Sequence, residues 1–167
     1  MKKIIIYMLC FVMAFLSTAC GSRSQQSEPK EPVKFYYCAQ SSDHRRMPSL
    51  IGAETREALG HKDNPEYLIS FYLSGPISYQ FSSPFPAGVS LQRLSVADGN
   101  ADITLSSQIS KLSDFDATLA FACLVLTVNE VLDVQTVTIR AKDSLINDSA
   151  SITLDVNSFA FEADAAQ

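Results

Sequence analysis

The sequence predicts one small α+β domain, a mixed β-sheet with two helices packed on one face. Three observations lead to this fold class. The 167 residues include 47% hydrophobic side chains, with 10 Phe and 6 Tyr, which is enough to bury a core. Short stretches alternate between apolar and polar residues, as half-buried strands do. Strands and helices are expected in the order ββαββαβ, with one more strand late in the chain, and this order is typical of a small mixed sheet.

The first half of the domain is predicted to be two strands and a helix. Residues 33–38 are rich in aromatic side chains, which favours a strand. Residues 51–56 alternate between Ile, Ala or Thr and Gly, Glu or Arg, which predicts a second strand. Asn64 is a good N-cap and Pro65 a good first helical residue, so a helix is expected from here. The Gly-Pro pair at 75–76 predicts where that helix ends.

The second half is predicted to be a hairpin, a helix and two strands. Apolar residues alternate on both sides of Asp98-Gly99-Asn100, which is typical of a hairpin with one buried face. Gly99 is expected to adopt a positive φ in this turn. Ser113 has an aspartate three residues later, a pattern typical of a helix start, and this helix is expected to run to about Leu132. Residues 137–139 and 152–156 alternate again and predict strands.

The first 19 residues are predicted to be an export signal. Two lysines precede an unbroken apolar stretch over 4–16, which is the length of a signal hydrophobic region. The small residues before Cys20 resemble the lipobox of bacterial lipoproteins, although Leu16 stands one position further from the cysteine than in the strict form. In such proteins, cleavage leaves the cysteine as the acylated first residue. The alternative is an ordinary secretory signal that leaves Cys20 as a spare thiol.

The residues after Cys20 favour the lipoprotein interpretation. Residues 21–31 are polar and show no apolar periodicity, as expected of a flexible tether. We therefore expect a lipoprotein signal peptide over 1–19 and a lipidated, palmitate-carrying Cys20 at the head of a linker over 20–32. The lipid would hold the domain on the extracytoplasmic face of the cell membrane.

Charge and motifs exclude several function classes. Loss of the two lysines with the signal leaves 11 basic against 18 acidic residues and no basic cluster, so nucleic acid is not an expected partner. The chain has two histidines, His44 and His61, each close to one aspartate, whereas a metal site needs three or four converging ligands. It contains no Gly-x-Ser-x-Gly sequence and no glycine-rich phosphate loop. We expect no enzyme activity, no cofactor and no metal.

Two cysteines remain for the domain if Cys10 leaves with the signal and Cys20 carries lipid. Cys38 and Cys123 each have apolar neighbours in the sequence, which favours buried free thiols. A disulfide between them is the alternative, because an oxidising envelope would permit it.

Several short motifs, in a fixed order, resemble a known family. They are a helix-ending Leu-Ser-Gly-Pro at 73–76, Pro-Ala-Gly-Val at 86–89, an Asp-Gly turn with a Leu-Ser strand end over 98–106, Leu126-Thr127, and Val-Thr-Ile at 137–139. In this order they are similar to the GerMN domain of sporulation and spore germination, found in bacterial envelope lipoproteins. Thr104 stands where the family often has Asp, and Asp143-Ser144 replaces its usual final Asp-Gly.

The resemblance implies a compact α/β domain over 33–143, related to ring-building modules of envelope-spanning assemblies. It implies no catalytic residues. Residues 144–167 would then form a C-terminal extension with a further strand and a frayed acidic tail.

Two functions from different classes follow. The first is a non-catalytic interaction or assembly domain that is linked to sporulation or germination and contacts another envelope protein. Its expected partner surface is an apolar stripe on the second helix, formed by Phe121, Val125, Val128 and Leu132, with Leu124 nearby. Alternatively, that stripe packs against the helix of residues 65–74.

The second function is an extracytoplasmic small-ligand-binding or sensory lipoprotein. Its pocket would lie between the loop of residues 39–48 and the proline-rich loop of residues 82–88, and several aromatic side chains would line it. A hydrolase is the least favoured of the three functions, because no serine or cysteine nucleophile has an evident general base.

Overall fold

The computed structural model describes residues 30–40 and 50–159, and it confirms the expected α+β class. The strands form two sheets instead of one. The first has three strands in the order β2-β1-β3, all antiparallel: β1 (Pro32–Ala39), β2 (Ile51–Glu57) and β3 (Phe81–Ser82). The second has four strands in the order β4-β5-β6-β7: β4 (Leu91–Ala97), β5 (Asn100–Leu105), β6 (Thr136–Ala141) and β7 (Ile152–Asp155).

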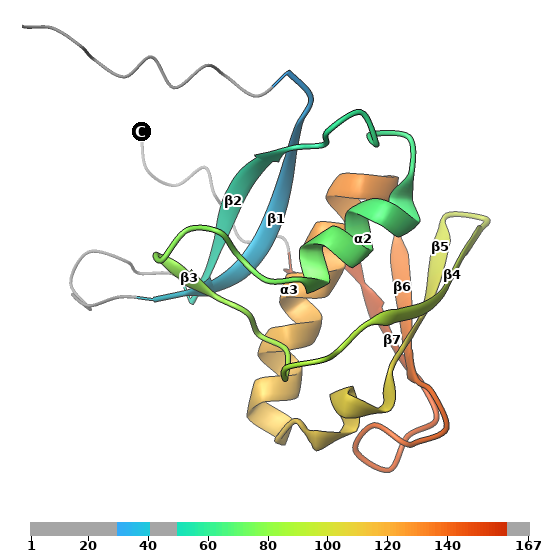
Figure 1. Ribbon diagram of the computed structural model, residues 1–167. Coiled ribbons are helices and arrows are strands. Elements are labelled where there is room, and N and C mark those ends of the chain that lie inside the picture. Colours follow the sequence, from blue (N-terminus) through green and yellow to red (C-terminus); the bar gives the residue numbers. More distant parts are fainter. Residues whose placement is uncertain (1–29, 41–49, 160–167) are drawn as a thin grey trace, which may run out of the picture.

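Two α-helices connect and cover these sheets. They are α2 (Pro65–Leu73) and α3 (Asp114–Leu132), and two short 3₁₀ helices, η2 (Ser107–Lys111) and η3 (Val156–Phe159), complete the elements of the described residues. Figure 1 shows α3 passing between the two sheets, with α2 lying across it. The helices therefore fill the space between two sheets rather than one face of a single sheet.

Local sequence signals set the ends of both helices. The Asn64 side chain accepts a hydrogen bond from the Tyr67 backbone N–H at 3.0 Å, and Pro65 is the first residue of α2. Gly75, at φ +96°, turns the chain away after this helix. The Ser113 hydroxyl caps α3 by accepting from the backbone N–H of Asp116.

The hairpin of β4 and β5 has the expected turn. Asp98 and Gly99 both have positive φ, +50° and +73°, as the favoured two-residue hairpin turn requires. β5 then pairs in parallel with β6, and α3 makes the crossover between them. β7 adds an antiparallel strand beside β6.

The edge of β1 explains why the strands divide into two sheets. Beyond its short pairing with β3, this edge faces α3. The Tyr36 backbone N–H donates to the Thr127 hydroxyl at 2.9 Å, and Thr127 is fully buried. A helix side chain thus satisfies a strand donor that another strand would otherwise pair with.

Helix α3 is the centre of the core. It is long and apolar enough to cross a membrane, but half of that stretch is buried inside the domain, as is typical of a core helix. Aromatic rings fill the space beside it: Tyr37 stacks on Tyr72 with ring centroids 4.9 Å apart, and Phe85 meets Tyr72 edge to face at 5.9 Å.

Candidate interaction surface

The predicted partner stripe on α3 is wrong. Phe121, Leu124, Val125 and Val128 are buried and Leu132 is partly buried, so the stripe offers no exposed strip. The physical reason is that α3 contacts α2, β1 and β6 at once, so that within residues 120–128 every side chain except the partly buried Leu126 is buried. The alternative, in which the stripe packs against the helix of residues 65–74, agrees with this burial, and α2 is one of several elements that contact α3. Cys20 lies outside the described residues, so its lipidation stays a prediction.

The inner face of β2 carries an ion pair that the sequence pattern did not reveal. The alternation over 51–56 gives the expected strand, but Glu54 and Arg56 are its buried side chains. Their Cα partners on β1 are Phe35 and Val33, which are both core residues. The charged pair therefore occupies positions where an apolar pair is the ordinary choice.

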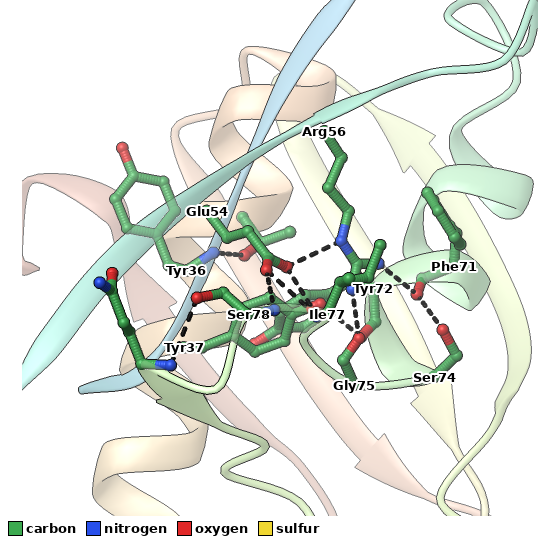
Figure 2. A network of polar contacts seen from close by, with 12 residues as sticks. Tyr36, Tyr37, Glu54, Arg56, Phe71, Tyr72, Ser74, Gly75, Ile77 and Ser78 are labelled. Atoms are coloured by element: carbon green, nitrogen blue, oxygen red, sulfur yellow. Dashed lines mark hydrogen bonds and ion pairs between the residues drawn. The ribbon is translucent and has the colours of Figure 1, made fainter. Parts of the chain in front are cut away.

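The ion pair is fully supported by surrounding groups (Figure 2). Arg56 Nε lies 2.8 Å from Glu54 Oε2, and the guanidinium also donates to the carbonyl oxygens of Phe71 and Gly75. The same guanidinium lies 4.7 Å from the ring centroid of Phe71 and 5.5 Å from that of Phe35. A buried charge pair is tolerated when the remaining donors and faces also find partners, as here.

Glu54 uses its carboxylate to fix the backbone of the loop after α2. It accepts from the backbone N–H groups of Ile77 at 3.1 Å and Ser78 at 2.6 Å. Arg56 holds the same loop through the Gly75 carbonyl. At the far end of the loop, the Gln80 carbonyl accepts from the Gln40 backbone N–H at 2.7 Å. The loop is thus pinned at both ends and in its middle.

This pinned loop presents two large side chains to solvent. The exposed fractions are 77% for Ile77 and 87% for Tyr79. We call residues 75–80 the braced loop. Side chains on a fixed backbone lose less conformational freedom on binding than those on a mobile loop, so this arrangement favours recognition of another surface.

The sequence analysis missed the braced loop, although signals were present. Two opposite charges two residues apart on a strand must share a face, and a loop that follows a Gly-Pro stop contained Ile77 and Tyr79. Neither signal showed that the loop folds back over the charged face of β2, because the residues concerned are distant in sequence.

A cavity of about 460 Å³ lies beside the proline-rich loop, where the ligand-binding hypothesis placed a pocket. Its lining combines one aromatic ring with small, polar and aliphatic residues: Cys38, Ser82, Ser83, Pro84, Phe85, Pro86, Lys111, Leu112, Asp116 and Leu119. The hypothesis expected several aromatic side chains, and among the described residues Phe85 is the only one in the lining. Residues 41–49, the greater part of the other expected wall, lie outside the described residues.

Three side chains that can carry charge line this cavity, namely Cys38, Lys111 and Asp116. Within residues 30–40 and 50–159, no three His, Cys, Asp or Glu side chains come together as metal ligands would. His61 stacks on Tyr67 with ring centroids 3.9 Å apart, and His44 lies outside the described residues. Cys38 and Cys123 are both free thiols.

This geometry defines the class of protein. It is a small α+β domain with two sheets around a central helix, and it exposes Ile77 and Tyr79 on the braced loop. The family model named Germane, described as sporulation and spore germination, matches residues 34–145, and the chain belongs to this family. The expected family resemblance is confirmed.

A solved structure shows the same fold. The first GerMN domain of the sporulation protein GerM from Bacillus subtilis has a TM-score of 0.55 at 13% identity, over 71% of this chain and 90% of that domain. The tandem GerMN domains of the same protein give 0.49 at 20% identity, over 68% of this chain and 39% of that one. Among curated proteins, none matches the chain.

Proposed function

We propose that this protein is a lipid-anchored extracytoplasmic bacterial protein whose GerMN domain is a non-catalytic interaction module. Membership of a sporulation and spore germination family supports the biological setting. The lipobox-like residues before Cys20 and the polar segment after it support the anchor. The observation that carries the interaction role is the braced loop, in which a buried ion pair fixes the backbone that carries the exposed side chains of Ile77 and Tyr79.

We place the partner contact at Ile77 and Tyr79. A buried Glu54–Arg56 pair costs desolvation energy, and it is used to fix a surface loop rather than to fill the core. The partner that fits is another envelope protein with an apolar pocket bordered by hydrogen-bond acceptors. Tyr79 would insert its ring into that pocket, and its hydroxyl would donate a hydrogen bond to one of the acceptors, as tyrosines at the centre of interfaces do.

The test replaces both exposed side chains, as Ile77→Ser with Tyr79→Ser, in the full-length chain expressed in its own cells. The matched control is Phe115→Ser, because Phe115 is also large, apolar and 69% exposed but lies on α3. Photo-crosslinking from position 79 should yield one protein adduct that is absent when the crosslinker stands at position 115. The double variant should keep its melting temperature and lose co-purification of that partner.

If the double variant keeps its partner while remaining folded, the braced loop is not the binding surface. If crosslinks instead arise equally from both positions, the domain has no preferred face and the interaction role fails.

The anchor is tested separately through Cys20. Wild-type protein should stay with membranes and partition into detergent, because two or more acyl chains give stable attachment. Cys20→Ser should accumulate as an unlipidated precursor. Wild-type protein that is quantitatively soluble after export, without acyl mass on Cys20, would overturn the anchor while leaving the braced loop untouched.

A further inference from the structure

Two cysteines that are far apart in the sequence, Cys38 on β1 and Cys123 on α3, lie where this strand packs against this helix. The Tyr36 N–H on β1 donates to Thr127 on α3 at 2.9 Å, and on the same two elements the Cys38 and Cys123 side chains interact and shift each other's pKa. Cys123 is fully buried, whereas Cys38 is partly exposed and lines the cavity of about 460 Å³. One sulfur atom can therefore be reached from outside, and the other lies directly behind it.

The register of β1 against α3 holds this pair in place. Tyr36 and Cys38, two residues apart on β1, face Thr127 and Cys123, four residues apart on α3. Two strand residues span about 6.6 Å and four helical residues about 6 Å, so the two contacts repeat at nearly the same spacing. The hydrogen bond from the Tyr36 N–H to Thr127 thus fixes the strand and helix at the offset that brings the thiols together.

The electrostatic surroundings give the two thiols different roles. The hydrogen bond from Cys123 lowers the pKa of Cys38, and this outweighs burial and the nearby Asp116 carboxylate, which both act to raise it. The same hydrogen bond and burial raise the pKa of Cys123. Lys111 also borders the cavity, and the buried Tyr72 hydroxyl lies on the α2 side of the pair. Cys38 is therefore the thiol that ionises first.

We propose that Cys38 and Cys123 are an oxidisable dithiol pair, which closes to a disulfide between β1 and α3 when it meets a disulfide-bearing oxidant. The oxidant is a small-molecule disulfide or the disulfide of an oxidoreductase. In the cell this step rests on the proposed export, because structural disulfides persist in oxidising compartments. With the purified protein, the same oxidation can be tested without assuming export.

The chemistry balances as two thiol–disulfide exchanges. The Cys38 thiolate attacks one sulfur of the oxidant, forms a mixed disulfide and expels one thiolate. Cys123 loses its proton to that thiolate, attacks the Cys38 sulfur and expels the second thiolate, which takes up the proton first released by Cys38. Two electrons pass to the oxidant, which leaves as two thiols, and the protein gains one S–S bond.

Closing the bond would tie the first strand to the central helix. The bond requires the two sulfur atoms to approach to about 2.05 Å. Oxidation should raise the melting temperature, because the crosslink restricts the unfolded chain. The exposed loop at Ile77 and Tyr79 would keep its support from Glu54 and Arg56, which belong to a separate network.

The experiment uses the full-length chain with Cys10→Ser and Cys20→Ser, so that only the pair can react. Folded protein is incubated with oxidised glutathione at a series of ratios to reduced glutathione. We expect both thiols to disappear together, with a mass loss of two hydrogen atoms and a peptide crosslinked between positions 38 and 123. Dithiothreitol should reverse the change.

Three variants separate the roles of the thiols. Cys123→Ser keeps a hydroxyl donor beside Cys38 but cannot form the bond, so it should stop at a glutathione adduct on Cys38. Cys38→Ser should leave Cys123 unreactive until the domain is unfolded. The alkylation midpoint of Cys38 should lie below the ordinary thiol value of 9.0 in Cys123→Ser and move upward in Cys123→Ala, which lacks the donor.

The wild-type mass measurement keeps the proposal testable even if a variant fails to fold. Accumulation of a glutathione adduct on Cys38 without the crosslinked peptide would overturn it, as would reaction of the pair only in denaturant. Trapping the exported protein from cells with a maleimide then separates the two proposals. A pair that oxidises in the tube and is reduced in cells would contradict export and leave the dithiol pair intact.

Discussion

Each of the two sheets contains an arginine–carboxylate pair, and the two pairs have nearly the same length and opposite surroundings. Arg56 and Glu54 approach to 2.8 Å in the three-stranded sheet, with side chains only 4% and 9% exposed. Arg140 and Asp102 approach to 2.9 Å in the four-stranded sheet, with side chains 43% and 33% exposed. Contact distance alone therefore does not show how much each pair contributes to the stability of the fold.

The difference lies in what else each charge contacts. Arg56 also donates to two backbone carbonyls and lies over aromatic rings, and Glu54 accepts two backbone N–H groups. The Arg140 guanidinium reaches Asp102 across β5 and β6, two strands that are already joined by backbone pairing. Burial and the number of satisfied partners thus decide the role of a charge pair. Three of the four predictions that follow test this difference, and the fourth tests the hairpin turn of the four-stranded sheet.

The largest effect is expected from a buried carboxylate that has no partner. Val125→Asp places one on α3 at a fully buried position, in contrast to the paired Glu54. We expect a loss of more than about 4 kcal/mol in the free energy of unfolding, enough to prevent folding. Urea denaturation with Val125→Ala as control separates the charge from the lost volume. A folded Val125→Asp domain would mean that α3 is not enclosed as described.

The next effect comes from removing one member of the buried pair. Arg56→Met leaves Glu54 buried without its cation, and a loss of about 3–5 kcal/mol is expected. Replacing both residues, as Glu54→Gln with Arg56→Met, should recover part of this loss, because no net charge then remains buried. Arg140→Met is the matched control in the other sheet. Equal losses for the two arginine variants would break the comparison between the sheets.

A smaller loss is expected at the hairpin turn of the four-stranded sheet. Gly99→Val forces a β-branched residue to φ +73°, which should cost about 1–3 kcal/mol. A Cβ at this position would meet only Gln135, at 3.9 Å, so backbone strain and not crowding is the cause. Gly99→Asn is the control, since asparagine tolerates this conformation better. Equal thermal midpoints for all three proteins would show that the turn relaxes at no cost.

The same contrast shows how far the sequence could predict the fold. The hairpin around Asp98 and Gly99, the cap at Asn64 and the start of α3 at Ser113 all depend on neighbours within a few residues, and all were predicted. Their signals are local, so one sequence is sufficient to find them.

The three-stranded sheet was predicted less well, because its decisive contacts join distant residues. Alternation identified β2 but not that its charged side faces inward, where Arg56 meets the end of α2. Burial of the stripe containing Val128 depended on how many elements surround α3, which periodicity does not show. Contact between Cys38 and Cys123 likewise needed the register of β1 against α3.

The smallest effect is expected at the exposed pair. Asp102→Asn removes the negative charge but keeps the side-chain shape, and the backbone pairing of β5 with β6 is unaffected. Because both side chains remain hydrated, the attraction that is lost is nearly matched by better solvation of Arg140, and added salt screens what is left. We expect a thermal midpoint within measurement error of the wild type and the same midpoint at low and high ionic strength. Glu54→Gln, measured beside it, should lower the midpoint clearly, because the carboxylate it replaces is buried and accepts from two backbone donors. A larger loss for Asp102→Asn than for Glu54→Gln would contradict the conclusion that burial and satisfied partners decide what a charge pair contributes.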